Sequence, residues 1–262
     1  MTDWLADDVA IVTGGASGNG RAISLTLAEH GANVVVADLQ PDPREGGTPT
    51  HEKIRDEYDQ EAEYVECNVA SIEDFQKAVS TADDLGGVSI MVNNAGITQS
   101  DDFLETTEEE FDQIMDINVK GVFFGSQEAA KSMIDADRSG TIVNMSSVTS
   151  FIGRGDGVRY TTSKGAVESM TRALADRLGG SDIRVNSVHP SMIKTSMTDE
   201  DLDLIDNESE EEHRQKTPLG RIGQPQDVAN TVLYLVSPLA SFISGEALTV
   251  DGGVTTTLGG GY

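Results

Sequence analysis

Short apolar runs rich in β-branched residues alternate with longer stretches of helical periodicity along most of the chain. The first run, DVAIVT, spans Asp8 to Thr13, and similar runs occupy residues 33–39, 64–69, 88–93, 141–145, 184–188 and 247–250. Strands separated by helices in this order are typical of a doubly wound parallel sheet. The pattern predicts an α/β protein with a single-domain Rossmann fold over residues 1–262, in which helices cover both faces of the sheet.

The longest helical stretch begins with a clear N-terminal capping signal. Thr107-x-x-Glu110 has the spacing of a capping box, in which each side chain bonds to the backbone of the other residue. The helix expected to follow places apolar residues at the spacing of a buried face, namely Phe111, Ile114, Met115 and Val119.

The segment from Met197 to Lys216 is strongly acidic, with Leu202, Leu204 and Ile205 set into it. Two interpretations stay open. The segment is either a pair of solvated helices or, together with the residues from 191 onward, a mobile lid over a substrate.

The net charge of the chain says more about its partners and source than the rest of its composition does. The chain has 45 acidic against 18 basic residues, a formal net charge of −27. Such a surface repels phosphate backbones and anionic lipids, which argues against nucleic-acid and membrane partners. The acidic excess indicates either a very soluble protein or adaptation to molar salt, where screening over ~3 Å removes most self-repulsion. We favour a salt-loving source, which predicts instability at low salt.

Several features predict a cytoplasmic protein. Cys67 is the only cysteine, so no internal disulfide can form, and it is expected to be a small core residue rather than a reactive thiol. No apolar stretch approaches the ~20 residues of a membrane span. The first residues, MTDWLADDVAIVTGG, lack the basic leader of a signal peptide.

A glycine-rich turn, TGGASGNG from Thr13 to Gly20, stands where the first strand should become a helix. Gly14 would allow the tight turn, Gly18 would let the backbone approach a diphosphate, and Gly20 would permit close packing of helix on strand. The helix N-terminus would then point its free N–H groups at phosphates. The spacing differs from the common G-x-G-x-x-G, and such a turn alone can be purely structural.

Asp38 strengthens the nucleotide interpretation. It ends the second strand, 24 residues after Gly14, where a carboxylate can accept hydrogen bonds from the ribose hydroxyls of a dinucleotide. The same charge would repel a 2′-phosphate, and no Lys or Arg stands at residues 39–43 or in the glycine turn. NAD is therefore favoured over NADP. The alternative is a capping or loop role for Asp38.

Tyr160-x-x-x-Lys164 places a phenol and an ammonium on one helical face. A phenol has an ordinary pKa near 10, and a nearby ammonium favours the phenolate and brings this pKa toward neutrality. The spacing alone is common by chance. Ser146 and Ser147 end the fifth strand, and the carboxyl ends of strands are where open α/β sheets bind ligands.

Together these motifs resemble those of the short-chain dehydrogenase/reductase family over nearly the whole chain. The resemblance rests on TGGASGNG, NNAG at Asn93 to Gly96, IVNMSS at Ile142 to Ser147, YTTSK, VHPSMIKT at Val188 to Thr195, and PLGRIGQPQDVA followed by VDGG. The C-terminal half also looks like that of bacterial secondary-alcohol dehydrogenases.

The resemblance implies four catalytic residues. Tyr160 would be the general acid/base and Ser147 would hold the substrate oxygen. Lys164 would bind the nicotinamide ribose and lower the tyrosine pKa, and Asn118 would hold a water of a proton relay. Ser147 is preferred to Ser146 because the family's serine lies thirteen residues before its tyrosine.

The resemblance also implies a cofactor site. Its residues would be Gly14, Ser17, Gly18, Asn19, Gly20, Asp38, Leu39, Asn68, Val69, Asn94, Ala95, Gly96, Tyr160, Lys164, Ile193 and Thr195. Two positions depart from the family pattern. Ser191 replaces the glycine that usually follows His-Pro, and Asn68 replaces an aspartate that usually contacts adenine. Neither change removes a catalytic group.

Substrate contacts are expected from Ser147, Tyr160 and a lining of Ile97, Thr149, Phe151, Arg154, Met192 and Met197. Arg154 and Arg159 could clamp a substrate carboxylate. The alternative is that they form salt bridges with Asp156 and its neighbours.

The resemblance implies a homotetramer, built by pairing helices over 107–136 and 160–178. The expected contact face consists of Ala166, Val167, Met170, Ala173 and Leu174. No metal site is expected, because LGGGY at Leu258 to Tyr262 contains no carboxylate cluster.

The sequence thus predicts an NAD-dependent oxidoreductase that interconverts a secondary alcohol, sugar hydroxyl or sugar-acid hydroxyl and its ketone by hydride transfer. The alternatives are an NADPH-dependent 3-oxoacyl reductase and a non-catalytic dinucleotide-binding regulator. The substrate, its stereochemistry and the direction of reaction stay open.

Overall fold

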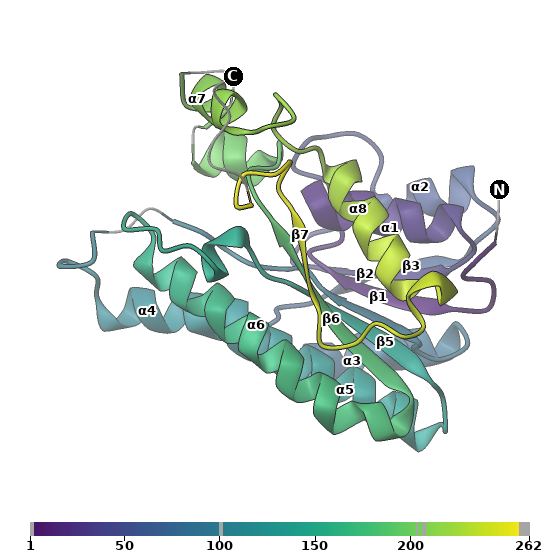
Figure 1. Ribbon diagram of the computed structural model, residues 1–262. Coiled ribbons are helices and arrows are strands. Elements are labelled where there is room, and N and C mark those ends of the chain that lie inside the picture. Colours follow the sequence, from purple (N-terminus) through teal and green to yellow (C-terminus); the bar gives the residue numbers. More distant parts are fainter. Residues whose placement is uncertain (1–2, 100–101, 203, 206–207, 257–262) are drawn as a thin grey trace.

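A computed structural model describes residues 3–99, 102–202, 204–205 and 208–256 (Figure 1). Seven parallel strands form one sheet in the order β3-β2-β1-β4-β5-β6-β7. They are β1 (Val9–Thr13), β2 (Asn33–Asp38), β3 (Ala62–Glu66), β4 (Ile90–Asn93), β5 (Gly140–Met145), β6 (Ile183–Pro190) and β7 (Ala247–Val250). This order confirms the doubly wound Rossmann fold, with the reversal of winding between β1 and β4.

Helices cover both faces of the sheet (Figure 1). One face carries α1 (Gly18–Glu29), α2 (Thr50–Glu57) and α8 (Pro225–Val236). The other carries α3 (Ile72–Asp84), α4 (Glu108–Met115), α5 (Gly121–Asp135) and α6 (Val158–Leu178), while α7 (Glu208–Lys216) lies above the end of the sheet. Short helical turns are η1 (Asp116–Lys120), η2 (Val148–Ser150), η3 (Gly179–Ser181), η4 (Met197–Asp201) and η5 (Pro238–Ala240).

The two apolar cores follow from the alternation of side chains along the strands. In β1, Ala10 and Val12 pack with the core under α1 and α8, whereas Val9 and Ile11 pack with the core under α3 and α5. Burial of each Val, Leu or Ile side chain stabilises the fold by roughly 1.5–3 kcal/mol. The sheet is therefore held firmly from both sides, and its carboxyl edge is left to loops.

The helix expected after Thr107 differs in two respects. The capping box is present, with both the Thr107 and Glu110 side chains bonded to backbone, but the π-helical turn η1 separates α4 from α5. The prediction of a buried Phe111 is wrong, since it is 40% exposed, whereas Ile114 is only 3% exposed. The physical reason is that α4 extends away from the middle of the sheet, so only part of its apolar stripe finds a neighbour (Figure 1).

Two further expectations need correction. The third strand lies at Ala62–Glu66, earlier than the apolar run at 64–69, so Cys67 follows it and is buried just beyond its end. Residues 197–216 do not form a regular helix pair, because the described part of this segment contains the π-helical turn η4 and one α-helix, α7. Among the helices in the described part of the chain, none combines the length and apolarity needed to cross a bilayer.

Candidate active site

A cleft of about 700 Å³ opens at the carboxyl ends of the parallel strands, beside the reversal between β1 and β4. This is where open α/β sheets bind ligands. It is lined by most of the predicted site residues, namely Gly14, Ser17, Gly18, Asn19, Asp38, Leu39, Asn68, Val69, Asn94, Ala95, Gly96, Ser147, Thr149, Arg154, Tyr160, Lys164, Met192, Ile193 and Thr195. Of the predicted residues, Gly20 and Asn118 stand behind the lining.

The glycine turn has the backbone that its sequence requires. Gly14 and Gly18 have φ of 63° and 53°, in the left-handed region that favours glycine. A Cβ on Gly20 would lie 1.9 Å from the Gly14 oxygen, so only glycine permits this approach. The Asn94 amide closes the turn from β4, donating from Nδ2 to the Thr13 oxygen at 2.9 Å.

The start of α1 presents groups that suit an anion. The Gly18 N–H donates to a carboxylate oxygen of Glu45 at 3.0 Å, so a negative charge already lies at this helix N-terminus. The buried Asn19 Oδ1 has no hydrogen-bond partner among the described residues, and the residue Asn19 lines the cleft. A cleft with a free acceptor and anion-directed N–H groups fits the phosphates and hydroxyls of a dinucleotide.

Asp38 lies at the end of β2, beside the turn. Its carboxylate accepts hydrogen bonds from the N–H groups of Ala16 at 3.0 Å and Leu39 at 2.7 Å. Burial raises the pKa of Asp38 above its ordinary value, while the backbone donors from Ala16, Leu39 and Gln40 oppose that rise. Asp38 thus organises the loop and also lines the cleft, and its contact with a ribose stays a prediction.

Asn68 is held by the loop that follows β3. Its side-chain oxygen accepts from the Ala70 N–H at 3.0 Å, and its own N–H donates to Asp74 at 3.1 Å. The amide that replaces the family's aspartate is therefore fixed at the rim of the cleft.

Ser147 and Tyr160 come together from β5 and α6. Their side chains share a hydrogen bond, and Ser147 Oγ also accepts from the Thr149 N–H at 3.2 Å. Ser146 instead donates its hydroxyl to the backbone oxygen of Lys164 at 2.9 Å, away from Tyr160. The arrangement favours Ser147 as the residue paired with the tyrosine.

Lys164 lies one helical turn after Tyr160 and is almost fully buried. Its ammonium donates to the Met145 oxygen at 3.0 Å and lies 5.6 Å from the centre of the Tyr160 ring. Burial lowers the pKa of Lys164 to about 8.

The tyrosine itself departs from the expectation of a lowered pKa. Burial raises the pKa of Tyr160 above its ordinary value, while the hydrogen bond to Ser147 and the charge of Arg154 lower it by less. The physical reason is that the Lys164 ammonium donates to a backbone carbonyl, and burial outweighs the opposing contributions. In the protein alone the neutral phenol is therefore stabilised.

Asn118 lies in the π-helical turn η1 and is fully buried. Its amide accepts from the Ile97 N–H at 2.8 Å and donates to the Ile97 oxygen at 2.9 Å and to Ser163 at 3.1 Å. These bonds attach the loop after β4 to α6. They can form because the extra residue of the π-helical turn directs the Asn118 side chain inward. Its part in a proton relay stays a prediction.

The substrate end of the cleft contains most of the expected lining. Ile97, Thr149, Arg154, Met192 and Met197 line it, and the buried Thr149 hydroxyl has no partner among the described residues. Arg154 is held by two hydrogen bonds to Asp156, at 2.8 and 3.0 Å.

One residue expected in the substrate lining was placed wrongly, and of the two roles considered for Arg159 the structure favours an ion pair. Phe151 is not among the described residues that line the cleft, and its ring stacks on His189 with 4.6 Å between centroids. Arg159 is also absent from that lining, because its buried side chain faces α4, where it lies 3.9 Å from Glu110.

Comparisons with known proteins decide the family. A family model described as enoyl-(acyl carrier protein) reductase matches residues 14–255. The chain is 37% identical to the 3-oxoacyl-(acyl-carrier-protein) reductase of Aquifex aeolicus over 95% of this chain and 98% of that one. It is 38% identical to an NADP-dependent (R)-specific alcohol dehydrogenase of Lentilactobacillus kefiri over 97% and 99%. A short-chain type dehydrogenase/reductase from Mycobacterium marinum matches with a TM-score of 0.88 at 33% identity, with 97% of both chains covered.

The chain belongs to the short-chain dehydrogenase/reductase family. It is an oxidoreductase of CH–OH groups and their carbonyls that uses NAD or NADP, as the members of this family do.

Sequence reasoning missed part of this short-chain dehydrogenase site. Leu202, Leu204 and His213 line the cleft from the acidic segment, Thr217 lines it from just beyond that segment, and Arg44 lines it from the loop after β2. The absence of basic residues at 39–43 had suggested that this loop carries no cation near the cleft. Arg44, one residue further, reaches it, and only the loop conformation reveals this.

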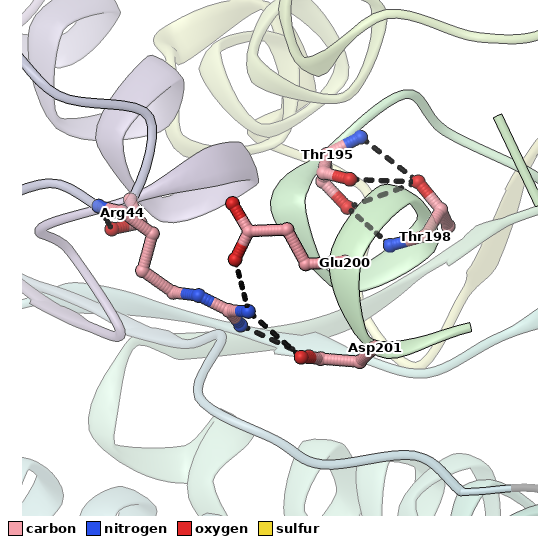
Figure 2. Close-up of polar contacts among 6 residues, drawn as sticks. Arg44, Thr195, Thr198, Glu200 and Asp201 are labelled. Atoms are coloured by element: carbon pink, nitrogen blue, oxygen red, sulfur yellow. Dashed lines mark hydrogen bonds and ion pairs between the residues drawn. The ribbon is translucent and has the colours of Figure 1, made fainter. Parts of the chain in front are cut away.

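The segment that begins at Ser191 folds over the cleft. Thr198 Oγ1 donates to the Ile193 oxygen at 2.7 Å. It also accepts from the Thr195 N–H at 3.0 Å, and these bonds fix the turn η4 (Figure 2). From η4, Glu200 and Asp201 accept hydrogen bonds from the Arg44 guanidinium at 2.7–2.9 Å (Figure 2). Ser191, in place of the family's glycine, lines the cleft, and its N–H donates to the Val250 oxygen at 3.1 Å.

Within the residues that the structure describes, no three His, Cys, Asp or Glu side chains are grouped as metal ligands. The run Leu258 to Tyr262 lies outside the described residues.

Proposed function

We propose that this chain is an NAD-dependent dehydrogenase that interconverts a secondary alcohol and its ketone, with Tyr160 as the general acid/base. The observation that carries the proposal is the hydrogen bond between Ser147 and Tyr160 at the carboxyl end of β5, with the Lys164 ammonium buried beside the phenol ring. All three side chains face a cleft large enough for a dinucleotide and a small molecule.

Each side chain has a distinct task in this proposal. When bound, the nicotinamide ring would supply or accept the hydride. Ser147 and Tyr160 direct their hydroxyls at the substrate oxygen, so the negative charge that develops there during reduction meets preorganised donors. Tyr160 gives its proton to that oxygen in reduction and removes it in oxidation. Lys164 would hold the nicotinamide ribose with its ammonium.

The preference for NAD rests on Asp38. Its carboxylate lies where the ribose hydroxyls of the adenosine half would donate, and its charge would repel a 2′-phosphate. Arg44 would be the cation available to offset that repulsion, but its guanidinium already binds Glu200 and Asp201.

The test is an initial-rate assay of the full chain with NAD and NADP in parallel, in ~2 M KCl and at low salt. Secondary alcohols, sugars and sugar acids form the substrate panel. We expect turnover with NAD, loss of turnover but retained NAD binding in Tyr160→Phe, and relaxed preference toward NADP in Asp38→Ala. Full activity of Tyr160→Phe would contradict the catalytic assignment, and unchanged preference in Asp38→Ala would contradict the ribose assignment.

A second candidate is an NADPH-dependent 3-oxoacyl reductase, favoured by the name of the Aquifex aeolicus relative. Turnover of an acetoacetyl thioester with NADPH alone would select it. A non-catalytic regulator would bind the dinucleotide and turn over nothing in the panel.

We propose further that residues 191–216 form the substrate lid of a single catalytic domain, and that the chain is a homotetramer. The exposed Phe111, Phe123 and Ile134 on α4 and α5 support a helix-paired interface. Val167, expected at that interface, is fully buried within the chain because it faces the sheet, so it cannot contribute. Light scattering on the protein as it elutes from a size-exclusion column measures the oligomeric state directly.

A further inference from the structure

The charges at the substrate end of the cleft bear on which substrates it accepts. Asp38 and Arg44 lie at the nucleotide end, and Lys164 lies beneath the tyrosine. Arg154 and Asp156, in the loop between η2 and α6, are therefore the two permanently charged side chains that line the substrate end among the described residues. His213 from α7 also lines it, with Nδ1 2.7 Å from the Ser209 oxygen.

Arg154 and Asp156 neutralise one another. Arg154 Nε and Nη2 donate to the two carboxylate oxygens of Asp156 at 2.8 and 3.0 Å, a fork-to-fork pair. The hydrogen bond from Arg154 is the main reason that the pKa of Asp156 lies below its ordinary value. The Nε and Nη2 edge of the guanidinium is thus occupied by the protein's own carboxylate, which also offsets its charge.

Much of the remaining wall of this end is apolar. Its apolar part consists of Ile97, Ile152, Met192, Met197, Leu202 and Leu204, and the groups beside it include uncharged hydroxyls such as that of Thr149. An ionised substrate group placed against such a wall loses hydration without gaining an oppositely charged partner, and that loss disfavours binding. An apolar substituent gains by leaving water there.

We propose that the enzyme acts on neutral secondary alcohols and ketones with apolar substituents, and that Asp156 is a specificity-determining residue because it neutralises Arg154. The inference rests on the proposed function. Removing the Asp156 charge would expose the guanidinium, and the same cleft would then accept a keto acid.

The experiment compares 4-oxopentanoate with its methyl ester, which differ in the charge of one group and in one added methyl. For the wild-type chain we expect kcat/KM for the ester to exceed that for the acid at least tenfold. In Asp156→Asn the ratio should shift toward the acid by at least tenfold, and adding Arg154→Gln should cancel that shift. Glu57→Gln removes a carboxylate from an exposed ion pair away from the cleft and should leave the ratio unchanged.

A wild-type preference for the acid, or an unchanged ratio in Asp156→Asn, would overturn the proposal. If neither probe is turned over, their inhibition constants against the best substrate of the panel give the same ratio. Absence of turnover with every substrate and both dinucleotides contradicts the proposed function instead, so the two failures are distinguishable. Thermal melting of each variant separates altered specificity from loss of fold.

A second inference concerns Arg44 and comes from different contacts. The loop after β2 is fixed to the glycine turn, because the Arg44 N–H donates to Ser17 Oγ at 2.8 Å and Glu45 accepts from Gly18. The Arg44 guanidinium then reaches Glu200 and Asp201 in η4 (Figure 2). The two walls of the nucleotide end are thereby joined by residues far apart in the sequence.

The geometry points to a clasp, consisting of Arg44, Glu200 and Asp201, that closes the segment η4 against the loop after β2 and slows release of the dinucleotide. A lone exposed ion pair contributes little, but one guanidinium shared by two carboxylates forms a network. The Arg44 side chain is 35% exposed, so high salt should weaken the clasp without abolishing it.

Stopped-flow displacement of NADH tests the clasp without requiring turnover. We expect the NADH dissociation rate to rise at least fivefold in Arg44→Gln and equally in Glu200→Gln/Asp201→Asn, with no further rise when all three are combined. Lys53→Gln, on an exposed ion pair elsewhere, serves as the control. A rise in Arg44→Gln alone would mean that Arg44 contacts the nucleotide directly, and unchanged rates in both variants would mean that the clasp does not retain it. Either result overturns the inference.

Discussion

Lys164→Met should make the folded protein more stable at neutral pH while it abolishes catalysis. Burial lowers the pKa of the Lys164 ammonium from its ordinary 10.5 to about 8. Because one pKa unit corresponds to about 1.4 kcal/mol, keeping this ammonium charged in the folded protein below pH 8 costs about 3 kcal/mol. Methionine has a similar length and no charge, so it removes that cost.

The variant also loses a contact. The ammonium donates to the Met145 oxygen at 3.0 Å, and leaving that acceptor without its partner costs roughly 1–2 kcal/mol. We therefore expect the free energy of unfolding at pH 7 to rise by about 1–2 kcal/mol and Tm by roughly 5 °C. An enzyme that carries a destabilising but necessary charge is a case of stability exchanged for activity.

The stability difference between the wild type and Lys164→Met should change with pH in a defined direction. Between pH 8 and 10.5 the unfolded chain binds a proton at Lys164 that the folded chain has lost, so wild-type stability relative to the variant rises with pH. Urea unfolding of both proteins at pH 7 and 9.5, at one protein concentration and one salt, measures the difference. Titrations shared by the two proteins cancel in it.

Two results would refute this reasoning. One is a variant that is less stable than the wild type at pH 7, and the other is a stability difference that is the same at both pH values. Lys53→Met, on an exposed ion pair, is the matched control and should show no such pH dependence.

Three other predictions concern the turn, the thiol and the surface charge. In Gly20→Ala the new Cβ would lie 1.9 Å from the Gly14 oxygen. We therefore expect loss of NADH binding in a fluorescence titration and destabilisation of the fold by roughly 1–3 kcal/mol or more. The control is Gly155→Ala, whose Cβ would have no atom within 4 Å and which should behave as wild type. Burial raises the pKa of the Cys67 thiol to about 12, so iodoacetamide should label it at least 100-fold more slowly in the native protein than in urea. With a net charge of −27, the protein should melt at a lower temperature in dilute buffer than in ~2 M KCl; equal melting temperatures would contradict adaptation to salt.

Local patterns were sufficient to predict the fold. Apolar runs fix strands because each strand of a covered parallel sheet must be apolar, and the sheet order then follows from the family. The glycine turn could also be predicted from local residues. Gly14 has a left-handed backbone that favours glycine, and the close approach at Gly20 leaves no room for a Cβ. The Thr107–Glu110 cap depends on residues only three apart, and it too is present.

The site was less predictable where it depends on distant parts of the chain. The π-helical turn that carries Asn118 forms where the helix meets Ile97 and Ser163, and no local periodicity encodes it. The direction of a loop side chain is also set by its neighbours. Phe151 turned onto His189 and Arg159 turned toward Glu110, so neither lines the cleft. Arg44 reached the cleft because its loop folds back on Ser17.

The arrangement of strands has a consequence for how the chain forms during synthesis. Strand β1 pairs on one side with β2, which follows it closely, and on the other with β4, so the nucleotide half of the sheet is complete once Asn93 has left the ribosome. At the opposite edge the long strand β6 is covered only by the short strand Ala247–Val250, which pairs with it. Until then β6 offers an unpaired edge on which a second nascent chain can add a strand. A product truncated before Ala247 would therefore keep its glycine turn and yet be prone to aggregate, so the last strand also guards the enzyme's solubility.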